Sequence, residues 1–223
     1  MLKLSLFMRK IFLIFLLPIF LVDCTVIERL QSKNIEEIPS GAVLYDETFT
    51  DPESGWRTAN NNGSYVIYQA EGLHFFVDQS NLDLWSSPGL KFQDVRIEAE
   101  AIKIDGPDNN TFGILCRLQD EKNFYAFVIS SDGYAGIYKV VDGAYSLLNH
   151  QSMEFTSAIR QGEAINYLSA TCEGDQLGFT VNGEMLFEVK DEQFLSGDIG
   201  LMAGSFDDPQ VNIFFDNITV FKP

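Results

Sequence analysis

The chain has 223 residues, of which 46% are hydrophobic and 13% aromatic, and its formal net charge is −17. Nucleic-acid binders need clustered Lys and Arg to displace counterions, so nucleic acid and anionic lipid surfaces are poor partners for so acidic a chain. Neutral glycans, cations and basic partners remain compatible with this charge.

The first 24 residues have the layout of a secretory signal peptide. Lys3, Arg9 and Lys10 precede an apolar run over residues 11–22. This run is shorter than the about 20 residues that a membrane-spanning helix needs. The pattern predicts an N-terminal signal helix for export, with an uncleaved membrane anchor as the alternative.

The end of this segment, Leu21-Val22-Asp23-Cys24, resembles a bacterial lipoprotein box, in which the cysteine becomes the lipidated first residue. Asp23 departs from the Gly, Ala or Ser that normally precedes that cysteine. Lipidation of Cys24, simple cleavage and a retained anchor therefore all stay open. Residues 25–42 are predicted to be a tether and residues 43–223 the folded domain, placed in the cell envelope or outside the cell, with membrane contact only through the N-terminus.

From residue 43 onward the sequence predicts short antiparallel strands joined by tight turns. Asp132-Gly133, Asp142-Gly143 and Asn182-Gly183 supply the positive φ that hairpins require. Alternation of apolar residues predicts strands around residues 95–101 and 112–118. Further strands are predicted for residues 123–130, 134–141, 165–172, 176–181, 185–189 and 211–221. This number of short strands indicates two packed sheets.

The alternation also predicts which side chains face the core. Phe112, Ile114, Cys116 and Leu118 form one apolar face, which places Arg117 opposite. In the next strand the predicted core face is Phe124, Ala126 and Val128, which places Tyr125 on the other side. In the strand after it, Lys139 lies opposite Tyr138 and Val140.

Two cysteines remain in the domain once Cys24 is set aside, which favours a disulfide in an exported protein. Cys116 and Cys172 are each in phase with the apolar face of their strand. The alternative is two buried free thiols. A disulfide here closes a loop of ~55 residues and stabilises the domain by about 4 kcal/mol in the chain-entropy description.

Several motifs follow one another along the folded part of the chain. They are Tyr45-Asp46-Glu47-Thr48-Phe49 with Gly55-Trp56, Phe112-Gly113-Ile114-Leu115-Cys116-Arg117-Leu118-Gln119-Asp120, Asn123-Phe124-Tyr125-Ala126-Phe127, Asp132-Gly133-Tyr134, Val181-Asn182-Gly183, Gly197-Asp198-Ile199-Gly200-Leu201 and Phe215-Asp216-Asn217-Ile218-Thr219-Val220. With them, residues 43–222 resemble the concanavalin A-like lectin/glucanase superfamily, within it the laminin-G-like and 3-keto-disaccharide hydrolase-like domains of exported bacterial proteins. The resemblance implies an all-β, antiparallel two-sheet jelly-roll sandwich whose concave sheet face is the usual place for a sugar.

The resemblance is weaker for activity, because one sandwich hosts lectins, hydrolases and spacers alike. Glycanases of this superfamily carry Glu-x-Asp-x-(x)-Glu on one strand, so that two carboxylates flank the scissile bond. Glu98-Ala99-Glu100 followed by Asp105 does not match that motif. These carboxylates are interpreted as the solvated outer face of a sheet, and no catalytic residue is assigned.

The best candidates for a ligand-binding face are Arg117, Tyr125 and Lys139, with Trp85 as an outlying aromatic residue. An aromatic ring flanked by hydrogen-bond donors suits a sugar, whose C–H face stacks while its hydroxyls take hydrogen bonds. The alternative is that Arg117 and Lys139 only form ion pairs with Glu98, Glu100 or Asp120 on an exposed sheet.

Other polar residues are given structural roles. His74 and His150 are interpreted as structural or surface residues, and Trp56 as a core anchor. Asp216 with Asp46 or Glu47 offers a calcium site between the first and last strands, but a hydrogen-bonded turn is preferred. No cofactor or metal is predicted.

These observations predict an exported, non-catalytic module that binds a carbohydrate or another envelope component through one sheet face. A glycoside-processing hydrolase of the 3-keto-disaccharide hydrolase type and a purely structural interaction domain are the alternatives.

Overall fold

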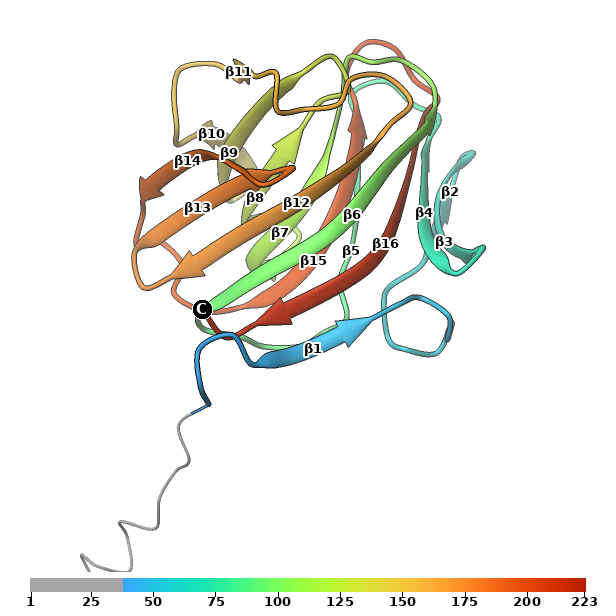
Figure 1. Ribbon diagram of the computed structural model, residues 1–223. Helices are drawn as coiled ribbons and strands as arrows, with labels where there is room; N and C mark the ends of the chain where they lie inside the picture. The colour runs from blue at the N-terminus through green and yellow to red at the C-terminus, as the bar shows by residue number, and fades with distance from the viewer. Residues whose placement is uncertain (1–37) are drawn as a thin grey trace, which may run out of the picture. The chain divides into compact units, whose positions relative to one another are not determined.

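The computed structural model describes residues 38–223, which form two antiparallel β-sheets packed face to face (Figure 1). The predicted all-β sandwich is confirmed. The predicted signal helix, Cys24 and the tether up to residue 37 lie outside the described residues. Within residues 38–223, no helix is long and apolar enough to cross a membrane.

The nine-stranded sheet has the order β14-β13-β12-β6-β16-β4-β3-β2, with β1 also paired to β16. Its strands are β1 (Val43–Glu47), β2 (Ala59–Asn61), β3 (Ser64–Gln69), β4 (Gly72–Val77), β6 (Val95–Asp105), β12 (Ile165–Glu173), β13 (Gln176–Val181), β14 (Glu184–Lys190) and β16 (Val211–Phe221). Gly41 and Ala42 already hydrogen-bond with Lys222, so the backbone pairing of the domain begins just before the predicted boundary at residue 43.

The seven-stranded sheet has the order β10-β9-β8-β7-β15-β5, with β11 also paired to β9. Its strands are β5 (Asp83–Ser86), β7 (Asn110–Asp120), β8 (Asn123–Ile129), β9 (Tyr134–Val141), β10 (Ala144–Leu147), β11 (Glu154–Phe155) and β15 (Asp198–Ser205). The predicted strands 134–141, 176–181 and 211–221 match β9, β13 and β16.

The predicted hairpin turns form as expected. Asp142 and Gly143, and likewise Asn182 and Gly183, all have positive φ, while in the third turn only Gly133 does. This geometry matches the right-handed twist of the paired strands on either side.

A single apolar cluster fills the space between the sheets, and side chains from both sheets contribute to it. Phe75, Phe179 and Phe215 come from the nine-stranded sheet, and Phe112 and Phe127 from the seven-stranded sheet; all five are fully buried. Trp56 also belongs to this core, as predicted.

The disulfide between Cys116 and Cys172 is present and joins β7 of one sheet to β12 of the other. Both cysteines belong to the buried core. The bond closes a 56-residue separation, so the predicted stabilisation of about 4 kcal/mol applies to it.

The prediction of which side chains of β8 point into the core is wrong, because the two faces of the strand are exchanged. Tyr125 and Phe127 point into the core between the sheets, whereas Phe124, Ala126 and Val128 form a second apolar cluster on the outer face of the seven-stranded sheet. Both faces of β8 are buried and apolar, so alternation alone could not identify the core side.

The predicted apolar face of β7 also changes side along the strand. Arg117 has φ +53° and lies where the pairing of β7 with β8 and β15 shifts register. This bulge moves Leu118 to the outer cluster, while Cys116 stays in the inner core.

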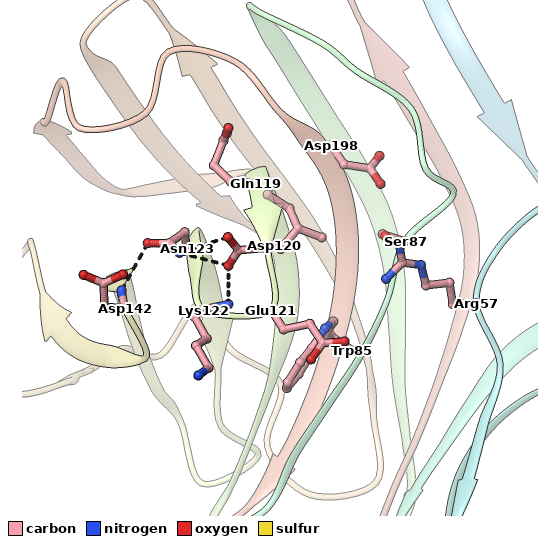
Figure 2. A pocket seen from close by; sticks show the side chains of 11 residues that line it. Arg57, Trp85, Ser87, Gln119, Asp120, Glu121, Lys122, Asn123, Asp142 and Asp198 are labelled. Atoms are coloured by element: carbon pink, nitrogen blue, oxygen red, sulfur yellow. Dashed lines mark hydrogen bonds between the residues drawn. The ribbon is translucent and has the colours of Figure 1, made fainter.

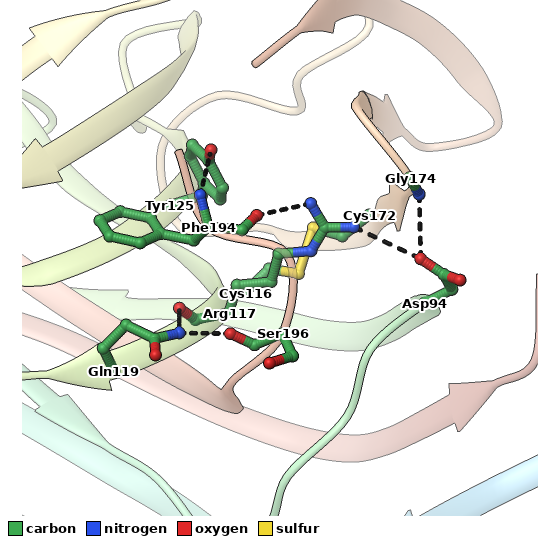
Figure 3. Close-up of a disulfide and its surroundings, with 9 residues drawn as sticks. All are labelled: Asp94, Cys116, Arg117, Gln119, Tyr125, Cys172, Gly174, Phe194 and Ser196. Atoms are coloured by element: carbon green, nitrogen blue, oxygen red, sulfur yellow. Dashed lines mark hydrogen bonds and ion pairs between the residues drawn. A yellow bond between two sulfur atoms is a disulfide. The ribbon is translucent and has the colours of Figure 1, made fainter. Parts of the chain in front are cut away.

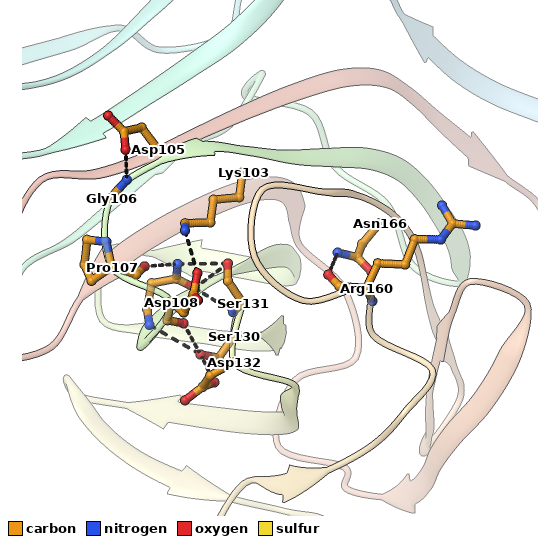
Figure 4. A network of polar contacts seen from close by, with 11 residues as sticks. Lys103, Asp105, Gly106, Pro107, Asp108, Ser130, Ser131, Asp132, Arg160 and Asn166 are labelled. Atoms are coloured by element: carbon orange, nitrogen blue, oxygen red, sulfur yellow. Dashed lines mark hydrogen bonds and ion pairs between the residues drawn. The ribbon is translucent and has the colours of Figure 1, made fainter.

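Buried polar groups at one end of the sandwich are satisfied internally (Figure 4). Lys103 forms an ion pair with Asp108 at 2.5 Å. The Asn110 side-chain amide donates to Pro107 O and Ser131 Oγ, and its Oδ1 accepts from the Ser131 amide. These contacts hold the β6–β7 loop to the end of β8, which is a structural role.

Candidate ligand-binding groove

The outer face of the seven-stranded sheet carries aromatic side chains from four strands. Trp85 on β5 lies 6.4 Å from Phe124 on β8, measured between ring centroids, and Phe124 lies 6.3 Å from Tyr145 on β10. Tyr138 on β9 is 6.1 Å from Tyr145. These rings come from strands spread across the sheet, so they cover the apolar residues of its central strands.

A hydrogen bond joins the two edges of this sheet across its outer face. The Tyr145 hydroxyl on β10 donates to Asp83 Oδ2 on β5 over 3.0 Å. In the sheet order, β10 and β5 are the outermost strands. The sheet must therefore curve strongly, and two hollows lie along its outer face beside a smaller one.

The first hollow, called here the Trp85 depression, has a volume of about 620 Å³. Polar side chains dominate its lining, which consists of Arg57, Trp85, Ser87, Leu118, Gln119, Asp120, Glu121, Lys122, Asn123, Asp142 and Asp198. Figure 2 shows the side chains around the β7–β8 turn on one side, with Asp142 of the β9–β10 turn beyond them. Trp85 of β5, Asp198 of β15 and Arg57, which precedes β2, lie on the other side. Arg57, Trp85 and Glu121 also line an adjoining 230 Å³ hollow that reaches Asp83.

The β7–β8 turn in this depression is held in place by hydrogen bonds. Asp120 Oδ1 accepts from the amide of Lys122 and from the side chain of Asn123, and these bonds hold the pKa of Asp120 below its usual range. Asn123 Oδ1 in turn accepts from the amide of Asp142 (Figure 2). These hydrogen bonds therefore hold the polar groups of the turn in fixed positions.

Asp198 lies on the other side of the depression, and its contacts have a structural role. It accepts hydrogen bonds from the backbone amides of Gly89, Leu90 and Ile199. Burial nevertheless raises the pKa of its carboxyl group, against the effect of these donors. Asp198 holds the loop after β5 against β15.

The second hollow, called here the Asp83 pocket, has a volume of about 300 Å³. Its lining is mainly apolar and consists of Asn81, Asp83, Thr111, Ala126, Val128, Tyr138, Tyr145, Met202, Ser205 and Phe206. Burial raises the pKa of Asp83, although the hydrogen bond from Tyr145 opposes this shift. Burial and the Asp83 charge also raise the pKa values of Tyr138 and Tyr145, so both phenols stay neutral donors at physiological pH.

The Trp85 depression, the Asp83 pocket and the small hollow between them are together called the groove. Of the four predicted ligand-binding residues, only Trp85 lines it. Arg117 and Tyr125 have exposed fractions of 1% and 0%, so their predicted exposure on a ligand face is wrong. Lys139 pairs across strands with Tyr125 and shares its inner face.

Arg117, Tyr125 and Lys139 do come together, but they fasten the loop between β14 and β15. The Tyr125 hydroxyl donates to Asp191 Oδ1 and Lys139 Nζ donates to Asp191 Oδ2, both at 2.5 Å. Figure 3 shows Arg117 beside the disulfide, donating to Phe194 O at 2.8 Å.

The ion pairs predicted for Arg117 and Lys139 are also corrected. Arg117 lies 3.5 Å from Asp94, and Lys139 pairs with Asp191. Burial lowers the pKa of Arg117, against the effect of Asp94. Burial works against the Asp191 charge, but the donors Lys139 and Tyr125 outweigh it and hold the pKa of Asp191 below its usual range.

The remaining predicted residues lie away from the groove. Glu98 and Glu100 line a 540 Å³ hollow on the nine-stranded sheet, where the Glu98 side chain is 41% exposed and pairs with Arg96. His74 is buried between the side chains of Gln69 and Asn212, which is a structural role.

The first and last strands, β1 and β16, which would hold the less favoured calcium site, do pair, but Asp46 and Glu47 have other partners. Asp46 Oδ1 accepts from Thr219 Oγ1 at 2.7 Å, and Glu47 Oε1 accepts from the Phe49 amide at 2.6 Å. Within residues 38–223, no group of three or more His, Cys, Asp or Glu side chains is arranged to hold a metal ion.

Sequence reasoning missed Asp83, Tyr138 and Tyr145. A signal for Asp83 was available, because residues two apart on a strand share a face and Trp85 was already a candidate. The position of Tyr145 opposite Asp83 depends on the curvature of the sheet, which no local pattern shows.

The sequence matches no protein-family model and no curated protein. Solved structures of the same fold do match. The carbohydrate-binding module CBM66 from Bacillus subtilis has a TM-score of 0.61 at 21% identity, over 75% of this chain and 95% of that one. A protein of unknown function with a galectin-like fold from Bacillus subtilis has a TM-score of 0.60 at 12% identity, over 82% and 97% of the two chains.

A mixed-linkage-glucan GH16 protein from Bacteroides ovatus, in complex with G4G4G3G product, has a TM-score of 0.56 at 10% identity. It matches over 80% of this chain and all of that one. Together these similarities show that the described domain has the fold of these proteins, an antiparallel two-sheet β-sandwich.

Proposed function

We propose that the protein is a non-catalytic module that binds carbohydrate on the outer face of the seven-stranded sheet, with Trp85 as its main stacking residue. The observation that carries this proposal is the combination of aromatic rings and positioned polar groups in adjoining hollows. Sugars present C–H faces to aromatic rings while their hydroxyls exchange hydrogen bonds with donors and acceptors.

The Trp85 depression supplies both kinds of contact. The Trp85 ring lies beside donors from Arg57 and Lys122 and acceptors from Asp120 and Glu121. Its volume of about 620 Å³ falls in the range typical of small-ligand sites. Carbohydrate binding by a protein with the same fold, the CBM66 module, supports the assignment.

The central strands of this sheet favour binding over hydrolysis. A glycoside hydrolase needs two carboxyl groups flanking the scissile bond. The outward positions on β7, β8 and β15 are instead occupied by Leu115, Ala126 and Met202, all in the outer apolar cluster. Glu98 and Glu100 lie on the other sheet and cannot serve this groove.

Export is part of the proposal. A disulfide between the sheets is compatible with an oxidising compartment outside the cytoplasm. We propose that residues 1–24 are the signal, that the residues from 25 up to the first backbone pairing at Gly41 are a tether, and that Cys24 is lipidated in the mature protein. Mass spectrometry of the mature N-terminus tests this, since a lipid-modified Cys24 supports it and an unmodified N-terminus or a retained signal contradicts it.

The test of function is a glycan-array screen of the purified protein beside its Trp85→Ala variant. Loss of this stacking residue should weaken glycan binding by about tenfold or more. Tyr167→Ala is the matched control, because Tyr167 is a 48% exposed aromatic residue on the other sheet. Thermal melting of each variant confirms that it is folded.

Three outcomes would contradict the proposal. If folded wild-type protein binds no glycan, a structural interaction domain becomes the better assignment. If Tyr167→Ala loses binding instead of Trp85→Ala, the site lies on the nine-stranded sheet. If bound oligosaccharide is cleaved, the protein is a hydrolase.

A further inference from the structure

Asp83 is a carboxylate in mainly apolar surroundings that forms no ion pair within residues 38–223. Its hydrogen-bond partner is the neutral hydroxyl of Tyr145. The carboxylate occupies space left by a glycine, because a Cβ on Gly204 would lie 1.9 Å from Asp83 Oδ1. Burying a charge without a partner of opposite sign costs free energy, and such groups occur at functional sites.

The other ionisable groups around Asp83 do not neutralise it. Tyr138 and Tyr145 line the Asp83 pocket together with Asp83, and both are uncharged. Arg57 and Glu121, which carry charges of opposite sign, line the adjoining hollow. Arg57 is exposed and lies beyond ion-pair distance of Asp83. The negative charge is therefore available to a ligand.

We propose that the Asp83 pocket binds the protonated amine of an amino sugar, so that the preferred ligand is a glycan with free amino groups. This rests on the proposed carbohydrate-binding function. A carboxylate forms strong charge-assisted hydrogen bonds to an ammonium group. The rings of Tyr138, Tyr145 and Phe206 line the same pocket and offer the aromatic faces that attract cations.

The neighbouring surface favours the same ligand class. Four carboxylates line the Trp85 depression, against the two basic side chains of Arg57 and Lys122. The whole chain carries a net charge of −17, which attracts a cationic oligosaccharide over distance. Further sugar residues of the chain would lie along the Trp85 depression, which adjoins the Asp83 region through the shared hollow.

The experiment compares two oligosaccharides that differ only in their amino groups. The purified protein is titrated calorimetrically with the glucosamine hexamer and with the N-acetylglucosamine hexamer at neutral pH and moderate salt. We expect the amine-bearing hexamer to bind about tenfold more tightly or better. Asp83→Asn, which keeps the side-chain shape and removes the charge, should abolish that preference.

A control separates the pocket from the general charge of the protein. Glu184→Gln removes one negative charge from an exposed position on β14, in the other sheet. This variant should keep the preference for the glucosamine hexamer. Equal losses in Asp83→Asn and Glu184→Gln would show non-specific attraction and overturn the inference.

The remaining outcomes separate this inference from the proposed function. If both hexamers bind equally and Asp83→Asn changes neither affinity, the amino-sugar inference fails while carbohydrate binding stands. If neither hexamer binds but neutral glycans do on the array, the inference again fails alone. If no glycan of any kind binds, the proposed function fails with it.

Discussion

The two faces of the seven-stranded sheet use similar residue types for opposite purposes. On the inner face, Tyr125 and Lys139 share one partner, Asp191, and fasten a loop. On the outer face, Tyr145 is 49% exposed and contacts a carboxylate that forms no ion pair in residues 38–223. The Tyr125–Asp191 contact thus includes a basic partner and fastens the fold, whereas the Tyr145–Asp83 contact lacks one among the described residues and belongs to the proposed binding face.

The largest expected effect concerns the inner face. Replacing both cysteines, as in Cys116→Ala with Cys172→Ala, should lower the free energy of unfolding by about 4 kcal/mol, because it releases a 56-residue loop. Urea denaturation measures the loss. Glycan affinity of the folded variant should be unchanged, since neither cysteine lines the groove. A parallel loss of affinity would show that the inner face also contributes to binding.

A smaller effect is expected from Tyr125→Phe. The hydroxyl that is removed donates to Asp191 and accepts from the Phe194 amide. Its loss leaves the Phe194 amide without this acceptor and takes one donor from Asp191, which keeps Lys139 and the Gln193 amide. The free energy of unfolding should fall by about 2 kcal/mol. Glycan affinity should stay within about twofold of wild type. A tenfold loss would show that Tyr125 contributes to glycan binding.

Gly204→Ala tests the outer face, because it changes the space that the Asp83 side chain occupies. The added methyl group collides with Asp83 Oδ1 and also lies 2.9 Å from Thr111 Cγ2. Crowding of this kind should cost about 1 kcal/mol of stability. The variant should also lose the preference for amine-bearing glycans, since Asp83 must move, and calorimetric titration with the two hexamers measures this. An unchanged preference would show that the position of Asp83 does not matter.

The smallest expected effect is on the stability of Asp83→Asn. Burial raises the folded-state pKa of Asp83, so the folded protein binds more protons than the unfolded chain between the two pKa values. Stability from this group therefore falls as pH rises through that interval. Asp83→Asn should be slightly more stable than wild type at pH 7, and the difference should shrink as pH falls towards 4. Thermal melts across this range test the sign, and a less stable variant at pH 7 would identify Asp83 as a structural residue.

Local sequence determined much of the architecture. Alternating residues and Asp-Gly or Asn-Gly turns predicted strands that match β9, β13 and β16, because strand period and positive φ depend on near neighbours. The even pair of cysteines in a domain expected to be exported favoured a disulfide, and the inward phase of Cys116 and Cys172 was compatible with it; the structure forms this bond between the two sheets.

Only the tertiary structure decided which face of the seven-stranded sheet points outward and carries the proposed site. Phe124 and Tyr125 are both fully buried, so the pattern of β8 has no polar side to mark the exterior. The bulge at Arg117 then moves Leu118 to the opposite face. The contact between Asp83 and Tyr145 joins the two edge strands, and it exists because the whole sheet curves. Curvature and bulges arise from the packing of many strands together, which is why short-range patterns could propose Trp85 but not the groove around it.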